Sequence, residues 1–137
     1  MPDSLTTIAD FIRFTYSRLN CEPVFFGHGT NNSWDEAVSL VLQSLNLPWD
    51  FARDLWTCNL SKEERELLIN TIDARVSGRI PLAYLTNQAW FCDLRFYVDE
   101  RVLIPRSPIA ELIQNRFSPW ALNDRLSNDE PVNVLDL

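Results

Sequence analysis

Apolar residues recur every three or four positions near the start of the chain, which is the spacing of one helical face. The residues of this face are Leu5, Ile8, Phe11, Ile12, Thr15, Tyr16 and Leu19. Asp3 or Ser4 can cap the helix, because a short polar side chain accepts a hydrogen bond from an amide that lacks a partner in the first turn. The pattern therefore predicts an amphipathic helix with a buried apolar face.

The loop that follows, residues 21–32, contains Pro23 and two glycines, which interrupt helices. Phe25 and Phe26 are expected to pin this loop to the core. His28 is the one histidine of the sequence, and a loop-anchoring hydrogen bond explains it more easily than catalysis. A single histidine also excludes a multi-histidine metal site.

A second helix is predicted with Ser33 as its N-cap, so that Trp34 is its first residue. Ser33 and Glu36 have the spacing of a capping box, in which each side chain bonds the backbone amide of the other residue. Asp35 and Glu36 then lie in the first turn, where acids suit the helix dipole. The helix is expected to run to about Leu45 and to bury Trp34, Ala37, Val38, Val41, Leu42 and Leu45.

A second capping box, formed by Ser61 and Glu64, predicts another helix start. The apolar face of this helix consists of Leu68, Ile69, Ile72 and Val76. Gly78 is the expected C-terminal stop. Arg75 lies near the end of the helix, where a cation interacts favourably with the helix dipole.

The apolar period changes to two in the next segment, which indicates strands. Trp90, Cys92, Phe96 and Val98 alternate with other residues around a turn expected at residues 93–94. Aromatic and β-branched residues are enriched here, as in β-strands. The segment therefore predicts an antiparallel hairpin.

A third short strand is expected around Val102 and Ile104, followed by a helix that has Pro108 at its first position. The residues of this last helix that are expected to face inward are Ile109, Leu112, Ile113 and Phe117. It would connect the hairpin to whatever lies beyond it, so we interpret it as a linker helix.

These elements together predict a mainly α fold: a small N-terminal helical bundle, then a short antiparallel β-hairpin, then the linker helix. Three parts are expected along the chain. Residues 1–87 form the helical domain, residues 88–106 the hairpin linker, and residues 107–137 the linker helix and a final strand-like segment.

Composition narrows the class of protein. The 137 residues carry a net charge of −7, which argues against a broad nucleic-acid footprint. An acidic surface attracts basic protein partners, although the same balance also serves solubility. No apolar run approaches the ~20 residues of a membrane span, and no secretory signal is visible, so a cytoplasmic protein is expected. The three cysteines are far apart in the sequence, so no metal site is expected.

The most distinctive patterns lie in residues 79–113. The runs WFC at 90–92, FYV at 96–98 and VLIPR at 102–106 resemble the HemK-type N5-glutamine methyltransferases, which use S-adenosylmethionine. In that family such a segment links a helical N-terminal domain to the catalytic domain. The resemblance extends over nearly the whole chain. It implies that the helical domain recognises the substrate and that S-adenosylmethionine is the cofactor of the complete enzyme.

One branch of the family fits better than the other. Ala110 stands where the family pattern has Glu, and Glu111 follows one position later. This arrangement resembles the branch that modifies a large-subunit ribosomal protein, as do GHGT at 27–30 and AYLTN at 83–87. The resemblance implies a basic ribosomal protein as the substrate, with no direct contact to nucleic acid or membrane.

The end of the sequence bears on the cofactor. VLDL at 134–137 resembles the first strand of the Rossmann-like α/β catalytic domain, with Asp136 just before the Gly-rich turn that holds the cofactor. Neither that turn nor the family's Asn-Pro-Pro-Tyr motif is found in the sequence. We therefore interpret the chain as an N-terminal part of the enzyme, without catalytic or cofactor-binding residues of its own. Without neighbouring strands, residues 132–137 are expected to be disordered or to pair with a second molecule.

The candidate residues for contacts with substrate, or at the domain junction, are Arg106, Phe96 and Trp90. Arg106 directly precedes a helix start, where it can pair with a backbone carbonyl, substrate or cofactor, or form a structural ion pair. Three alternative functions stay open: a release-factor glutamine methyltransferase, an adenine-specific DNA methylase with a related Pro-Pro-Tyr type of motif, and a stand-alone helical interaction module.

Overall fold

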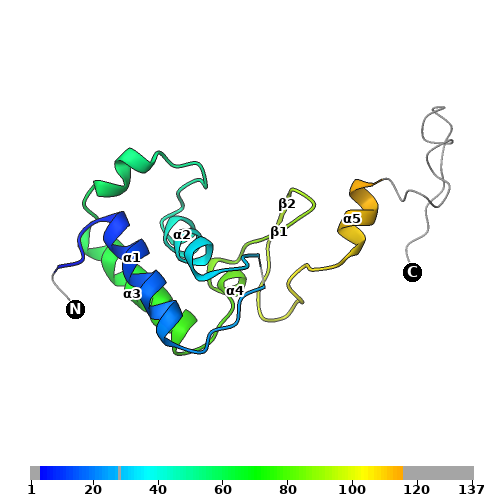
Figure 1. Ribbon diagram of the computed structural model, residues 1–137, viewed down its shortest axis with the longest axis horizontal. Helices are drawn as coiled ribbons and strands as arrows, with labels where there is room; N and C mark the ends of the chain where they lie inside the picture. Colours follow the sequence, from blue (N-terminus) through cyan, green and yellow to red (C-terminus); the bar gives the residue numbers. More distant parts are fainter. Residues whose placement is uncertain (1–3, 28, 116–137) are drawn as a thin grey trace.

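The part of the chain that the structure describes is mainly helical and contains a two-stranded antiparallel hairpin, as the sequence predicts. The computed structural model describes residues 4–27 and 29–115. Its elements in chain order are α1 (Ile8–Cys21), α2 (Ser33–Ser44), the 3-10 helix η1 (Arg53–Thr57), α3 (Lys62–Val76), α4 (Leu82–Thr86), β1 (Ala89–Phe91), β2 (Leu94–Phe96) and α5 (Ile109–Gln114). The long helices pack together, the hairpin projects from them, and α5 stands apart (Figure 1).

The core lies between α1, α2 and α3. Its largest fully buried apolar side chains are Phe11, Ile12, Leu19, Leu40, Val41, Leu42, Leu68 and Ile72. Two residues expected there are exposed instead: Tyr16 (40%) and Trp34 (48%). Their rings contact each other edge to face, with centroids 5.7 Å apart, so each covers part of the other at the surface.

α1 begins one turn later than the sequence suggested. Thr7 is its N-cap: Thr7 Oγ1 accepts a hydrogen bond from the Asp10 amide at 3.1 Å, and Asp10 Oδ2 accepts one from the Thr7 amide at 3.0 Å. The expectation of a cap at Ser4 is therefore wrong, and Asp3 lies outside the described residues. The Thr7 hydroxyl, and then the Thr6 and Thr7 amides, hold the pKa of Asp10 below its ordinary value.

α2 begins one residue earlier than expected. Asn32 is the N-cap, and its side-chain oxygen accepts a hydrogen bond from the Asp35 amide at 2.9 Å. Ser33 is instead the first helical residue, and its hydroxyl donates to Asn20 Oδ1 at 3.1 Å. With Asn32 as the N-cap, the residue three positions after the cap is Asp35 and not Glu36. Glu36 is therefore not part of a capping box, and its side chain is buried.

α3 follows the prediction closely. Ser61 and Glu64 form both hydrogen bonds of the capping box, at 3.2 and 2.8 Å. Leu68, Ile72 and Val76 are buried. At the other end, a Cβ on Gly78 would lie 2.6 Å from the carbonyl oxygen of Ala74, so this position requires glycine for its close approach.

The hairpin turn lies at Cys92 and Asp93, which have φ angles of 49° and 63°. Two successive positive φ values are typical of the type I′ turn, whose twist matches that of the strands. The turn expected at residues 93–94 is therefore displaced by one residue. No strand forms around Val102 and Ile104, although Ile104 is buried against Val98 in a second small core.

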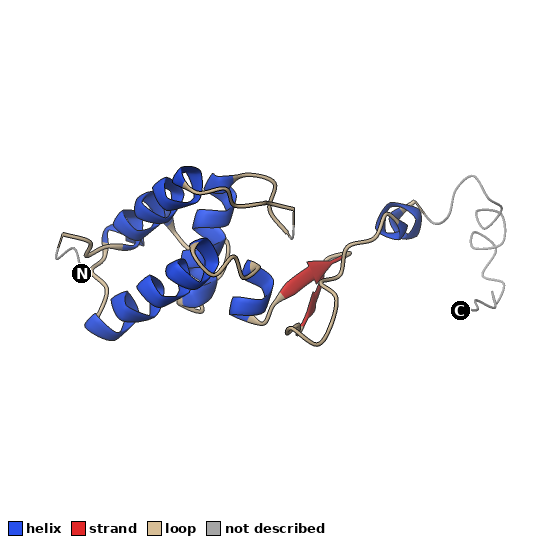
Figure 2. Ribbon diagram, turned by 90° about the horizontal axis from the view of Figure 1, so that it is seen from below, coloured by secondary structure: helices blue, strands red, loops and turns tan. Residues whose placement is uncertain are grey.

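α5 begins at Ile109, directly after Pro108. Its expected inward face is not buried: Ile109 is 43% and Ile113 45% accessible, and Leu112 is half-buried. Phe117, the segment 132–137 and Asp136 lie outside the described residues. Figure 2 shows α5 beyond the hairpin, connected to it by an extended segment.

Candidate functional site

A groove lies between α2 and the hairpin, with a cavity volume of about 930 Å³. We call it the α2–hairpin groove. Its walls come from the loop at residues 29–31, from α2, from residues 46–49 that follow α2, and from the hairpin. Ligand sites in proteins commonly have volumes of about 300–1,000 Å³, so the groove is large enough to bind part of another molecule.

The α2 side of the groove combines a closed floor with a polar rim. Ser39 and Leu42 are buried and form the floor, whereas Asp35 is exposed at the first turn of the helix. Gln43 and Asn46 contribute amide groups from the last turn and the residues after it. The wall can therefore offer both donors and acceptors of hydrogen bonds beside the buried side chain of Leu42.

The hairpin side of the groove is set by the strand register. Trp90 pairs with Arg95, whereas Ala89 pairs with Phe96. Directly opposite residues in an antiparallel sheet share a face, and successive residues alternate between faces. Trp90 and Arg95 therefore both line the groove, and Phe96 points to the other face.

The loop wall of the groove is held by a buried ion pair. The Arg75 guanidinium bonds Glu36 through Nε, and its Nη2 donates to the carbonyl oxygen of Phe25 at 2.8 Å. Thr30 Oγ1 donates to the other carboxylate oxygen of Glu36 at 2.8 Å. The pair thus fixes both ends of the loop between residues 25 and 30.

This arrangement bears on two expectations. Arg75 does lie in the last turn of α3, as expected, but its side chain is only 6% exposed and pairs with Glu36. Phe25 does not pin the loop to the core, since it is 85% exposed; its backbone carbonyl is the anchored group. Phe26 does pack against the core as expected, and His28 lies outside the described residues.

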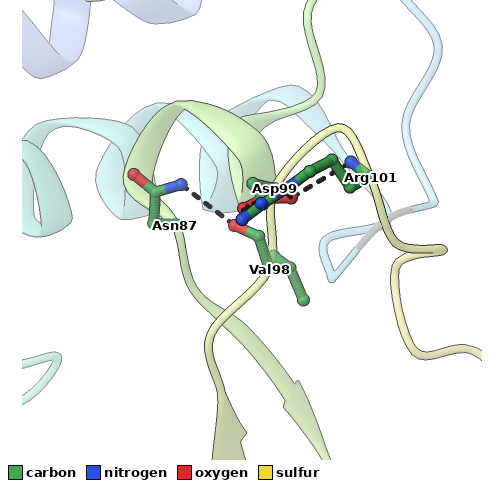
Figure 3. Close-up of polar contacts among 4 residues, drawn as sticks. All are labelled: Asn87, Val98, Asp99 and Arg101. Carbon is green, nitrogen blue, oxygen red and sulfur yellow. Dashed lines mark hydrogen bonds and ion pairs between the residues drawn. The ribbon is translucent and has the colours of Figure 1, made fainter.

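The hairpin is fastened to α4 by Asn87. Asn87 adopts a left-handed φ of 54° at the end of α4, and its Nδ2 donates to the carbonyl oxygen of Val98 at 3.0 Å (Figure 3). Tyr84 Oη donates to the carbonyl oxygen of Val102 at 2.7 Å. These two hydrogen bonds hold the segment that follows β2 against α4. They therefore help to set the direction in which the hairpin projects.

A local ion pair closes the next turn. The Arg101 guanidinium contacts both carboxylate oxygens of Asp99, at 2.6 to 3.2 Å (Figure 3). Hydrogen bonds from the Arg101 side chain, and then from its amide, lower the pKa of Asp99 to about 2. The pair lies at the surface, so we expect it to stabilise the turn at residues 99–101 and to have little influence on the rest of the fold.

The structure separates the three residues predicted as site candidates. Trp90 lies in the groove and is 59% exposed. Phe96 is 40% exposed on the opposite face, and Arg106 is exposed in the extended segment before α5. The groove thus contains one of the three.

Sequence reasoning missed the other residues of the groove. Trp49 is 64% exposed beside Pro48, and Arg95 shares the face of Trp90. A tryptophan directly after a helix-ending proline was an available signal for Trp49. Arg95 could be assigned to the face of Trp90 only once the turn was placed at residues 92–93.

The described residues include no cluster of three histidine, cysteine, aspartate or glutamate side chains that could hold a metal ion. In the same part of the chain, no helix combines the length and hydropathy needed to cross a bilayer. The sheet there is an antiparallel pair, and neither of its strands leads into a glycine-rich turn. The described residues therefore do not fit the type of site that holds a dinucleotide or S-adenosylmethionine in a Rossmann-like fold.

The chain is similar along most of its length to curated protein-glutamine methyltransferases. One of these is the ribosomal protein uL3 glutamine methyltransferase of Francisella tularensis subsp. tularensis (strain SCHU S4), which is 45% identical over 135 residues; these cover 98% of the chain and 42% of the relative. The protein of the same name from Bordetella pertussis (strain Tohama I) is 48% identical over 116 residues, or 85% of the chain and 39% of the relative. The chain thus spans about two fifths of the length of the curated relatives it matches. No protein-family model matches it.

Proposed function

We propose that the chain is the helical recognition and connecting part of an S-adenosylmethionine-dependent protein-glutamine methyltransferase that acts on ribosomal protein uL3. The observation that carries this proposal is the identity of 45% and 48% to two relatives of that name. The helical fold followed by a hairpin supports it, because the same order of elements is implied by the family resemblance.

Within this proposal, residues 1–87 recognise the substrate, residues 88–106 connect, and residues 107–137 lead into the catalytic domain. The anchoring of the hairpin by Asn87 and Tyr84 supports a connecting role, since it fixes the direction in which the chain leaves the helices. Arg106 and Phe96 are then candidates for the junction, and Trp90 for the substrate.

S-adenosylmethionine would supply a methyl group to the side-chain nitrogen of a glutamine: its methyl–sulfur bond would break as the carbon–nitrogen bond forms, S-adenosylhomocysteine would leave, and the amide would lose a proton. We propose that the cofactor binds outside residues 4–115, in agreement with the poor fit of the described residues. An amide nitrogen is a weak nucleophile, so accurate placement of the substrate must supply a large part of the rate. Placement is the contribution that a recognition domain can make.

The proposed partner is a basic ribosomal protein in the cytoplasm. The chain's net charge of −7 supports this, because opposite charges accelerate association and favour correct partners. The same charge opposes direct binding to nucleic acid.

Incubation of the whole protein with labelled S-adenosylmethionine tests the proposal. Three substrates are compared: uL3, a release factor and double-stranded DNA. We expect label on a glutamine of uL3, identified by peptide mass spectrometry. Label on the release factor or on adenine would instead establish one of the alternative enzymes, and label on none of them would favour a stand-alone interaction module.

A further inference from the structure

The α2–hairpin groove has the aromatic composition of a recognition site. Trp49 and Trp90 line it from different segments, and more than half of each side chain is exposed. Tryptophan is enriched among the residues that dominate binding energy at interfaces, because it offers a large rigid surface and a polar N–H group. Two such side chains in one groove indicate a place for another molecule to bind.

The polar side chains of the groove match a polypeptide. Gln43 and Gln88 each provide a donor and an acceptor, as does every peptide group of an extended chain. Asp35 and Arg95 add one charge of each sign, and neither takes part in an ion pair with another described residue. The groove can therefore satisfy a main chain and also select a charged side chain.

The sign of the selected charge follows from the aromatic groups. The face of an indole ring attracts cations and not anions. Asp35 adds a carboxylate, whose Oδ2 already accepts from Asn32 Nδ2 at 2.7 Å and whose other oxygen has capacity to accept more. Arg95 then suits main-chain carbonyl oxygens, which accept from a guanidinium. The net charge of −7 favours a basic partner in the same direction.

We propose that the α2–hairpin groove binds an extended segment of the substrate protein through a lysine or arginine side chain that is held by Asp35 and the two tryptophans. This inference rests on the proposed function for the identity of the substrate. It adds the location of the contact and its chemistry. The buried pair of Glu36 and Arg75 positions the wall at residues 29–31 and thereby keeps the groove open.

Fluorescence anisotropy with overlapping labelled peptides that span uL3 tests the contact directly, using the 137-residue chain. We expect at least one peptide with a basic side chain to bind, and Trp90→Ala and Asp35→Asn each to weaken that binding about tenfold. Replacing the peptide's basic residue by glutamine should give the same loss, with no further loss in combination with Asp35→Asn.

Two matched variants control for general effects. Trp34→Ala removes an exposed tryptophan of α2 outside the groove, and Leu94→Ala removes an exposed apolar residue on the opposite face of the hairpin. Both should bind the peptide normally. The proposal is overturned if no uL3 peptide binds, if the controls weaken binding as much as Trp90→Ala does, or if the groove variants alter only self-association or binding to an RNA oligonucleotide.

Kinetics of the whole protein on intact uL3 separate this inference from the proposed function. Trp90→Ala should raise KM about tenfold and leave kcat within about twofold, as expected for the loss of uniform binding. Methylation of uL3 with an unchanged KM would overturn the groove proposal and leave the function intact. Peptide binding that depends on Trp90, without any methylation of uL3, would support the groove and overturn the function.

Discussion

Glu36 of α2 and Arg75 of α3 form an ion pair that is almost completely buried, with 4% and 6% of the two side chains exposed. The remaining hydrogen-bonding capacity of the pair is directed at one loop, through the Thr30 hydroxyl and the Phe25 carbonyl. Two helices and the wall of the α2–hairpin groove therefore depend on the same pair of charges.

Removing one partner of this pair should be costly. Glu36→Leu leaves the Arg75 guanidinium buried without its counter-ion, and we expect a loss of about 3–5 kcal/mol in the free energy of unfolding, measured by urea denaturation. The surface pair of Arg18 and Asp73 is the control: Arg18→Ala should cost no more than about 1 kcal/mol for the ion pair.

The double variant of Glu36→Leu and Arg75→Met separates the cost of burying an unpaired charge from the contribution of the ion pair itself. Two apolar side chains in place of a buried pair are often neutral or stabilising, so much of the stability should return. The loop at residues 25–30 would still lose its anchors, and peptide affinity should remain low. Restored binding in this variant would show that the pair does not position the groove wall.

The helix caps give a second prediction, in which neighbouring residues behave differently. Asn32→Ala, Thr7→Ala and Ser61→Ala should each lower the free energy of unfolding by about 1 kcal/mol, because each removes a cap. Ser33→Ala should change it by no more than about 0.5 kcal/mol, since it removes only an exposed hydrogen bond. Equal losses for Asn32→Ala and Ser33→Ala in denaturant melts would contradict the assigned start of α2.

The hairpin turn gives a third prediction. Cys92→Val places a β-branched residue at a φ of 49°, and we expect a loss of about 1–2 kcal/mol in thermal or urea unfolding. Cys58 is a matched control because its φ of −66° is an ordinary extended value, so Cys58→Val should be close to neutral. Equal effects of the two substitutions would mean that the turn is not at residues 92–93.

Asp99 should titrate with a pKa of about 2, because the Arg101 side chain favours its ionised form. A folded-state pKa below the ordinary 3.8 stabilises the turn at pH values above 3.8, and this contribution is lost as the pH falls through about 2. The carboxyl-carbon chemical shift of Asp99 measures the titration by NMR. In Arg101→Ala the midpoint should rise towards 3.8; a wild-type midpoint already near 3.8 would contradict the pairing.

How far the sequence predicts this fold depends on how local each feature is. α3 could be predicted in position and buried face, because Ser61, Glu64 and the apolar spacing all lie within the helix. The start of α2 was misplaced because Asn32 and Ser33 are adjacent and both are competent caps. The role of Glu36 could not be inferred, since its partner Arg75 is 39 positions away and the pairing depends on how two helices pack.

The candidate site was predictable only in part for the same reason. Trp90 was recognisable from the alternating pattern. Which residues share its face of the hairpin depends on the turn at Cys92, and the positive φ of Cys92 could not be predicted from the sequence. The opposite wall comes from α2 and from Trp49, more than 40 positions earlier in the chain. For α5 the local pattern was misleading: its apolar spacing predicts a buried face, yet Ile109 and Ile113 are exposed.

The central claim is the proposal that this chain is part of an enzyme that methylates a glutamine of uL3. Mass spectrometry of uL3 isolated from cells that carry or lack the gene tests it most directly. We predict one glutamine of uL3 that bears a methyl group in the first case, is unmodified in the second, and regains the methyl group when the wild-type gene is restored. An identical methylation state of uL3 in the presence and absence of the gene would contradict the account.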